Sequence, residues 1–339
     1  MLQSLEIKNF TVFEEANLEF SAGLNIVIGE NGTGKSQLLK LGYVFLRTEH
    51  DNSNESLRHE TLSSNLIQTL GEVFRSEIPW NLCNRNHKEE SFDVKATFGQ
   101  DASMSFQLSA KDERYSAEFT PFPLNLLKPT FIPAREILSH FTGFAASLRN
   151  RELAFDKTFL DLADALALTP LKGKKAEQIK SITTSLEQQM NGRVVVENER
   201  FYIATNQERL EMPLVAEGIR KIAMLTYLIM NGSIQKGSTL FWDEPESNLN
   251  PKMMVQLAET LVILSNMGIQ IVLASHSLFL LRELEIQLAR HPEVPVQYFA
   301  LKPEKNGVSV SQGNTVSQID TIPMLDADLE QSDRYLGLE

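Results

Sequence analysis

The segment GENGTGKS at residues 29–36 constrains the fold of this chain more than any other part of its sequence. It matches the pattern G-x-x-x-x-G-K-[S/T], in which glycines let the backbone curl so that its N–H groups surround phosphate oxygens. The apolar run 24–28 before it predicts a buried strand, and residues 35–46 after it predict a helix. That helix would direct its positive dipole end at the same anion. Strand, glycine loop and helix in this order predict an α/β core with parallel strands.

The polar residues of this loop indicate which ligand it holds. Lys35 would bring a full positive charge to the β- and γ-phosphates, and the Ser36 hydroxyl would bind Mg²⁺. We therefore expect a P-loop NTPase that uses ATP and Mg²⁺, although the loop alone does not identify the kind of nucleotide protein. The predicted nucleotide-binding residues are Gly29, Asn31, Gly32, Thr33, Gly34, Lys35, Ser36 and Gln37.

A second apolar strand, in the segment STLFWDEPESNLNP (238–251), ends in two carboxylates. Asp243 would join Ser36 as a Mg²⁺ ligand, directly or through water. Glu244 would orient or activate the water that attacks the γ-phosphate, which makes it the predicted catalytic base. The alternative is a solvated acidic turn. The carboxyl end of a buried strand, where α/β proteins bind ligands, favours the catalytic interpretation.

Two further residues follow strand ends. His276 closes the strand IQIVLASHS (269–277) and would report the γ-phosphate through a hydrogen bond; a lone histidine is otherwise most often a structural residue. Arg135, in FIPAREIL (131–138), would either lie near the site or pair with a carboxylate at the start of a helix.

The rest of the chain alternates hairpins and helices. Period-two patterns predict hairpins at 2–20 with a turn near 14–16, at 91–110 with a turn at 99–102, at 193–205, and at 297–312 with a turn at Asn306–Gly307. Residues 50–65 read as loop-rich, followed by a helix at 66–76. The segment 135–190 reads as helical with a break at 169–175, and 250–266 reads as another helix. We divide the chain into the N-terminal part of an ATPase head (1–132), a mainly helical insertion with a hairpin (133–210), the C-terminal part of the head (211–312) and an acidic C-terminal tail (313–339).

Composition narrows the function. The formal net charge of −12 argues against binding nucleic acid over the whole surface, but leaves room for one basic groove. A single cysteine, Cys83, excludes an internal disulfide framework and fits the reducing cytosol. The most apolar long window, 261–281, is interrupted by polar residues and a glycine, so we expect no membrane span and a cytoplasmic protein.

These motifs in this order resemble the ABC-type ATPase heads of the RecF/SMC and OLD-like group. The matching segments are IKNF, GENGTGKS, AEGIRK, LFWDEPESNLNP and ASHS. The resemblance implies an ABC-type head with N-terminal antiparallel hairpins and a helical insertion. It also implies that two heads face each other, each ATP lying between the phosphate loop of one and a signature helix of the other. The residues implied are Ala216, Glu217, Gly218 and Arg220 in the signature that acts in trans, Ser247, Asn248 and Asn250 in the D-loop, and His276 as the switch histidine.

The chain departs from the family pattern at two points. Ala216 stands where the signature usually has a serine, so one hydroxyl donor to the opposite γ-phosphate is missing. Arg220 or Lys221 would supply compensating charge, or both are solvated basic side chains on a helix face. The glutamine that usually couples metal to partner is unassigned. Its candidates are Gln68, Gln100 and Gln107.

Three functions are open. The first is a slowly hydrolysing, ATP-gated dimer or higher homo-oligomer that acts as sensor or scaffold in bacterial genome (anti-phage) defence. OLD-like heads often carry a Toprim nuclease, for which residues 277–339 are too few, so this function implies a separate effector nuclease. The acidic segment LDADLE (325–330) reads as a solvated tail or a partner-docking segment. The second is a RecF-like repair ATPase, with LKGKKAEQIK (171–180) either contacting DNA locally or simply solvated. A transporter ATPase is the remote third, because an LSGGQ-type signature is missing.

Overall fold

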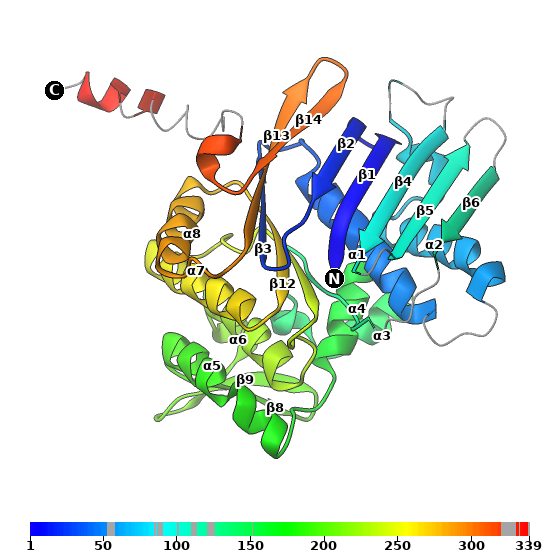
Figure 1. Ribbon diagram of the computed structural model, residues 1–339. Helices are drawn as coiled ribbons and strands as arrows, with labels where there is room; N and C mark the ends of the chain where they lie inside the picture. The colour runs from blue at the N-terminus through cyan, green and yellow to red at the C-terminus, as the bar shows by residue number, and fades with distance from the viewer. Residues whose placement is uncertain are drawn as a thin grey trace.

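Two large β-sheets with helices packed on them make up most of the computed structural model (Figure 1). It describes residues 1–52, 58–84, 86, 91–99, 102–109, 114–120, 126–150, 152–319, 330–331 and 333–337. Residues 320–329, 332 and 338–339 of the predicted tail, which include nearly all of LDADLE, and the candidate Gln100 lie outside the described residues.

The central sheet has six strands in the order β14-β13-β3-β12-β11-β7. Its five parallel strands are β3 (Leu24–Gly29), β7 (Thr130–Ile132), β11 (Thr239–Asp243), β12 (Gln270–Ser275) and β13 (Val296–Glu304), and β14 (Gly307–Gly313) pairs antiparallel with β13. Every residue of β3 and β12 is buried, as expected for parallel strands covered on both faces. The sheet confirms the predicted α/β P-loop fold and places the ends of β3, β11 and β12 side by side.

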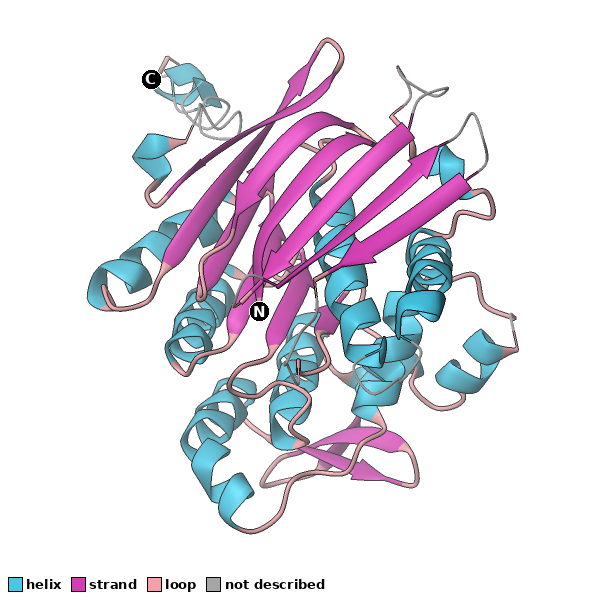
Figure 2. Ribbon diagram, turned by 45° about the vertical axis from the view of Figure 1, so that its right-hand side comes forward, coloured by secondary structure: helices cyan, strands magenta, loops and turns pink. Residues whose placement is uncertain are grey.

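The second sheet is antiparallel, in the order β2-β1-β4-β5-β6. Its strands are β1 (Leu2–Phe10), β2 (Phe13–Glu19), β4 (Ser91–Phe98), β5 (Ala102–Ser109) and β6 (Arg114–Phe119). The first hairpin turns at residues 11–12, not at the predicted 14–16, because Phe10 and Phe13 pair directly and are both fully buried. In Figure 2 the two sheets form one curved wall, with β2 against β14.

Two helices lie on the inner side of this wall. The helix α1 (Lys35–Asn52) contacts β1 of the antiparallel sheet and β3, β11 and β12 of the central sheet, so it packs on both sheets. The helix α2 (Arg58–Phe74) packs on α1. The loop predicted at 50–65 is wrong for most of its length. Residues 50–52 and 58–65 are helical, and residues 53–57 lie outside the described residues. The Asn65 side-chain amide donates to the Asn52 side-chain oxygen across the two helices at 2.7 Å.

The opposite face of the central sheet carries the remaining helices and a small sheet. The helices are α3 (Phe144–Arg149), α4 (Lys157–Leu166), α5 (Lys174–Met190), α6 (Glu217–Met230), α7 (Pro251–Asn266) and α8 (Leu278–Arg290). The small sheet has the order β10-β9-β8, formed by β8 (Arg193–Glu197), β9 (Arg200–Ala204) and β10 (Arg209–Glu211). The predicted helical region is confirmed over α3, α4 and α5, with the predicted break between α4 and α5, but residues 152–156 between α3 and α4 are not helical. One apolar core joins this region to the head, so the boundaries proposed at 132/133 and 210/211 stay a prediction.

Single short helices of one turn complete the described fold at Pro79–Leu82, Leu138–His140, Met212–Leu214 and Val316–Gln318. None of the helices in the described part of the chain has the length and apolar character needed to cross a bilayer.

Candidate ATP site

The phosphate loop lies between β3 and α1, as the sequence predicts. Gly32 and Gly34 have φ angles of 85° and 87°, which residues with side chains rarely adopt. A Cβ atom at Gly34 would lie 2.5 Å from Cγ2 of Val12 in the first hairpin. The N-terminal sheet therefore packs directly on the loop, and its packing requires a glycine there.

Lys35 is the first residue of α1, and its side chain is buried. Its ammonium group donates to the carbonyl oxygens of Gly29 at 2.7 Å and Glu30 at 2.8 Å. Burial lowers the pKa of Lys35, and the nearby carboxylates of Glu244, Asp243, Glu246 and Glu30, in that order, oppose this shift. The lysine of the loop and the carboxylates that follow β11 thus form one electrostatic unit.

Asp243 and Ser36 lie together, as a shared Mg²⁺ site requires. Burial is the main cause that raises the pKa of Asp243, and the nearby Ser36 hydroxyl opposes this shift. The Oδ1 atom of Asp243 is buried and has no hydrogen-bond partner in the described part of the chain. A buried carboxylate oxygen without a donor, beside a serine hydroxyl, fits a hard divalent cation.

Glu244 and His276 meet across the ends of β11 and β12. The Nδ1 atom of His276 lies 3.4 Å from Oε1 of Glu244, and both side chains are partly exposed. Glu244 has a positive φ angle of 47°, and its N–H donates to the Ala274 carbonyl oxygen at 2.9 Å. Strained backbone conformations of this kind concentrate at functional sites. The structure therefore brings the two predicted catalytic residues together.

The signature residues begin the helix α6. Ala216 is its N-cap and provides no side-chain hydrogen bond, so the first N–H groups of the helix have no cap. The side-chain amide of Asn248, in the D-loop, donates to Glu217 at 2.9 Å. Ala216, Asn248 and Asn250 are exposed, and Glu217 is half-buried. The signature and the D-loop thus form one surface.

Gly218 packs closely on the D-loop of its own chain. It is buried, and a Cβ atom there would lie 2.8 Å from Cδ2 of Leu249 and 3.3 Å from the Asn248 carbonyl oxygen of the same chain. The glycine allows the signature helix to pack on the D-loop.

The two basic residues of α6 point into their own chain. The guanidinium of Arg220 lies 2.7 Å from Oε1 of Glu136 and donates to the Val215 carbonyl oxygen at 2.6 Å. The ammonium of Lys221 donates to the hydroxyl and, at 2.9 Å, to the carbonyl oxygen of Ser247. Lys221 is 1% exposed, which excludes the solvated interpretation for it and makes a direct charge on a partner's ATP incompatible with this arrangement. Arg220 would have to leave Glu136 to act in trans.

Glu246 was not predicted as a site residue, and Lys221 was predicted only as an alternative to Arg220 for a charge on a partner's ATP, not as a residue that binds its own D-loop. A usable signal existed for Lys221, because it lies on the apolar face of α6 between the buried residues Gly218 and Leu225.

Two candidates for the missing glutamine lie away from this site. Gln68 donates to Glu72 on α2, and Gln107 is exposed on the outer face of the N-terminal sheet. The segment after β7, the strand beside β11, carries instead Arg135, which is exposed, and Glu136, which binds Arg220.

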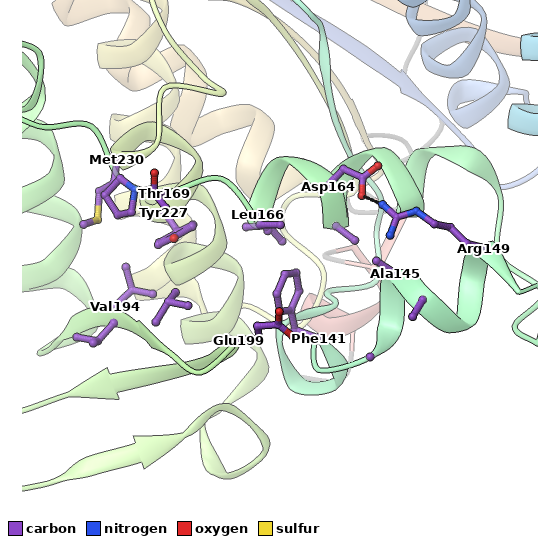
Figure 3. Close-up of a pocket in the computed structure, with 17 residues that line it drawn as sticks. Phe141, Ala145, Arg149, Asp164, Leu166, Thr169, Val194, Glu199, Tyr227 and Met230 are labelled. Carbon is purple, nitrogen blue, oxygen red and sulfur yellow. Dashed lines mark hydrogen bonds and ion pairs between the residues drawn. The ribbon is translucent and has the colours of Figure 1, made fainter.

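A cavity of about 680 Å³ lies elsewhere, between α3, α4, β8 and α6 (Figure 3). Its walls include Phe141, Leu166, Val194 and Tyr227, with the ion pair of Arg149 and Asp164 at one side. No residue of the phosphate loop lines it, so it is separate from the ATP site.

Comparison with known proteins agrees with this geometry. Residues 24–282 match the family described as "AAA domain, putative AbiEii toxin, Type IV TA system". The chain is 21% identical to an ATP/GTP phosphatase of Helicobacter pylori over 82% of its own length and 85% of that protein. It is 24% identical to the DNA replication and repair protein RecF of Streptococcus agalactiae over 48% of each chain, so it spans about half of that relative.

Solved structures extend the likeness to the whole fold. The SMC head bound to the C-terminal winged-helix domain of ScpA matches with a TM-score of 0.59 at 13% identity, over 93% of this chain and 98% of that one. The SMC head of Thermotoga maritima matches with a TM-score of 0.54 at 12% identity, over 93% and 99%. The chain therefore belongs to the AAA-domain family that carries this description, and its fold is that of an ABC-type ATPase head, similar to the heads of SMC proteins.

Proposed function

We propose that this ATPase is an ATP-gated, dimerising sensor or scaffold that hydrolyses ATP slowly and acts in bacterial genome defence with a separate effector nuclease. One observation supports this ATP-gated switch. The surface formed by Ala216, Glu217 and Asn248 is connected by hydrogen bonds, on its inner side, to the loop that contains Glu244. Lys221 makes this link, because its ammonium binds Ser247 at 2.9 Å and lies 3.4 Å from the Glu244 carbonyl oxygen. A head that uses this surface on a partner's ATP thereby moves its own catalytic loop.

The chemistry in each site would follow from the residues already placed. Ser36 and Asp243 would hold Mg²⁺, which neutralises charge on the phosphates, and Lys35 would turn from its loop carbonyls to the β- and γ-phosphates. Glu244 would accept the proton of the attacking water as the bond between the γ-phosphorus and the ADP oxygen breaks. His276 would donate to the γ-phosphate from the neighbouring strand end.

The dimer is tested by separating ATP binding from hydrolysis. Glu244→Gln keeps the shape of the side chain and removes the base, so with Mg²⁺ and ATP this variant should elute at about twice the monomer mass of 38.2 kDa. Light scattering after size exclusion gives the mass, and Lys35→Ala is the matched variant that should stay monomeric. A Glu244→Gln variant that remains a monomer at saturating ATP would contradict the switch.

The defence role rests on coarser support. The family description names a Type IV toxin–antitoxin system, and the motif order resembles OLD-like heads. The test expresses the chain with the genes that flank its own in a bacterial host and counts phage plaques. Protection that is lost in Lys35→Ala supports the proposal, whereas equal plaque counts with and without the genes contradict it.

DNA repair is the second candidate, because RecF and RecN proteins are among the relatives. Lys172, Lys174 and Lys175 are exposed before and at the start of α5 and would supply a local DNA contact. Binding to duplex DNA that weakens steeply as salt rises, and that is lost when these three lysines become glutamine, would favour this function. No binding at low salt would exclude it.

A further inference from the structure

We propose that Glu246 is a positioning residue for ATP hydrolysis, which holds the strand end carrying His276 in register with the loop carrying Glu244. The inference rests on the proposed hydrolytic roles of Glu244 and His276. It adds a residue to which neither the sequence motifs nor the relatives assign a role.

The first observation is the geometry of one carboxylate oxygen. Oε1 of Glu246 accepts a hydrogen bond from the Ser275 hydroxyl at 2.7 Å and another from the His276 main-chain N–H at 3.2 Å. The same oxygen lies 3.7 Å from Nδ1 of the His276 ring. One atom thus contacts the main chain and the ring of His276 and the residue before it.

The second observation is where Glu246 is attached. It follows Glu244 by two residues, across Pro245, and its own carbonyl oxygen accepts from the Leu249 N–H at 3.0 Å, which closes the turn into the D-loop. Among the described residues, the loop after β11 and the loop after β12 share no other side-chain hydrogen bond or ion pair except the 3.4 Å approach of Glu244 to His276. Glu246 is therefore the anchor that keeps the catalytic pair at its separation.

The third observation is burial. Glu246 is 5% exposed, whereas His276 and Glu244 are open to the site with side-chain exposures of 46% and 31%. Buried residues behind exposed reactive groups commonly hold those groups in position. Loss of such a supporting residue typically lowers activity about 10- to 100-fold.

The opposite oxygen of Glu246 makes a conservative test available. Oε2 is buried without a hydrogen-bond partner in the described part of the chain, so an amide nitrogen can replace it without breaking a bond. Glu246→Gln keeps an acceptor for Ser275 and His276, and Glu246→Ala removes it.

The experiment measures steady-state ATP hydrolysis of the full chain in a double-mutant cycle that combines substitutions of Glu246 and His276. We expect Glu246→Ala to lower kcat about 10- to 100-fold with KM changed less than about twofold, and Glu246→Gln to recover most of kcat. In a His276→Ala background, Glu246→Ala should lower kcat no further, because it acts through the histidine. Glu259→Ala, which removes an exposed glutamate of α7, is the control and should match the wild type.

Three results would overturn the proposal: an unchanged kcat in Glu246→Ala, an equal loss in the glutamine and alanine variants, or a loss that multiplies with that of His276→Ala. If Glu246→Ala does not fold, Ser275→Ala breaks the 2.7 Å bond and enters the same cycle with the same expectations. A His276→Ala variant with wild-type kcat would instead remove the histidine from the proposed function, and Glu244→Gln tests the ATPase itself separately.

Discussion

Gly34 illustrates at the scale of one residue how the phosphate loop depends on the N-terminal hairpin. Gly32 and Gly34 share nearly the same φ angle, but a Cβ atom at Gly32 meets nothing within 4 Å and one at Gly34 meets Val12 at 2.5 Å. The backbone penalty for a side chain is therefore common to both positions, roughly 1–2 kcal/mol, and the clash is confined to Gly34.

This pair gives the first prediction. Gly34→Ala should lower the free energy of unfolding more than Gly32→Ala and abolish ATP binding, because Val12 and the hairpin must move away from the loop. Urea unfolding and fluorescence titration with a labelled nucleotide measure the two effects. Equal losses of stability in the two variants would show that the hairpin does not constrain the loop.

Replacing Asp243, in contrast to replacing Gly34, is predicted to raise the stability of the fold. Burial raises its pKa above 3.8, so the folded protein binds this proton more tightly than the unfolded chain does. The contribution of Asp243 to stability is therefore present below pH 3.8 and is lost as pH rises through its folded pKa. Without Mg²⁺, Asp243→Asn should thus raise the melting temperature at pH 7, and this gain should shrink as pH falls toward 3.8.

The functional cost accompanies that gain, since asparagine should bind Mg²⁺–ATP poorly and abolish hydrolysis. Calorimetry at several pH values, with and without Mg²⁺, checks both parts. A variant that melts below the wild type at pH 7 in the absence of Mg²⁺ would mean that Asp243 stabilises the fold, contrary to its burial.

At the scale of elements, α6 is the part of the molecule that connects the two kinds of ATP contact. Its first residues form the signature surface, Arg220 binds the segment after β7 through Glu136, and Lys221 binds the loop after β11. Burial lowers the pKa of Lys221, and Glu217, Glu246, Glu244 and Glu136 oppose the shift. The helix is thus attached both to the segment after β7 and to the loop that follows Asp243.

Lys221→Met separates this attachment from ATP binding. Methionine fills a similar volume but removes the ammonium donor to the Ser247 carbonyl oxygen, at a cost of about 1–3 kcal/mol, and frees the loop of Glu244. We expect ATP binding by the monomer to be kept, while ATP-dependent dimerisation and hydrolysis fall at least about tenfold. Lys252→Met, at an exposed position of α7, is the matched control. Normal ATP-dependent dimerisation of Lys221→Met would show that the contact between α6 and the loop of Glu244 is not needed for the switch.

Elements also show how far the sequence could predict the structure. The runs with one dominant pattern, such as β3, β11, β12 and the helix α7, are where they were expected, because buried parallel strands and capped helices are locally encoded. The strands β6 and β10 were missed because half or more of their residues are exposed, so their pairing depends on β5 and β9 rather than on their own pattern. The helix α8 was not predicted because it directly follows β12, whose strand pattern dominates this part of the sequence.

The site divides in the same way. The phosphate loop and Asp243–Glu244 could be predicted because the residues that act together there are adjacent in the sequence. The roles of Glu136, Glu246 and Lys221 could not, because each depends on a contact with a residue far along the chain. Lys221 reaches Ser247, and Glu246 reaches Ser275.

At the scale of the whole molecule, the helical insertion is attached to the helix that follows the phosphate loop. Lys40 of α1 pairs with Asp156, the N-cap of α4, at 2.7 Å, and Tyr43 donates to Asp161 of α4 at 2.7 Å. Asp161 also pairs with Arg47 at 3.3 Å. A displacement of α1 on ATP binding would therefore be passed to α4 and to the walls of the 680 Å³ cavity, which include Ala163 and Leu166 of that helix.

Net charge gives the last prediction, because it acts on the whole molecule. Two heads that each carry a formal charge of −12 repel one another, and salt screens this repulsion, with a Debye length that falls from about 30 Å at 0.01 M to about 8 Å at 0.15 M. The ATP-bound dimer of Glu244→Gln should therefore tighten as NaCl rises through this range, as measured by sedimentation at saturating Mg²⁺–ATP. Binding to DNA through the lysines before and in α5 would change in the opposite direction, so one salt series separates the two proposed functions. A dimer that weakens with salt would mean that local pairs between opposite charges across the interface outweigh the repulsion of the two heads.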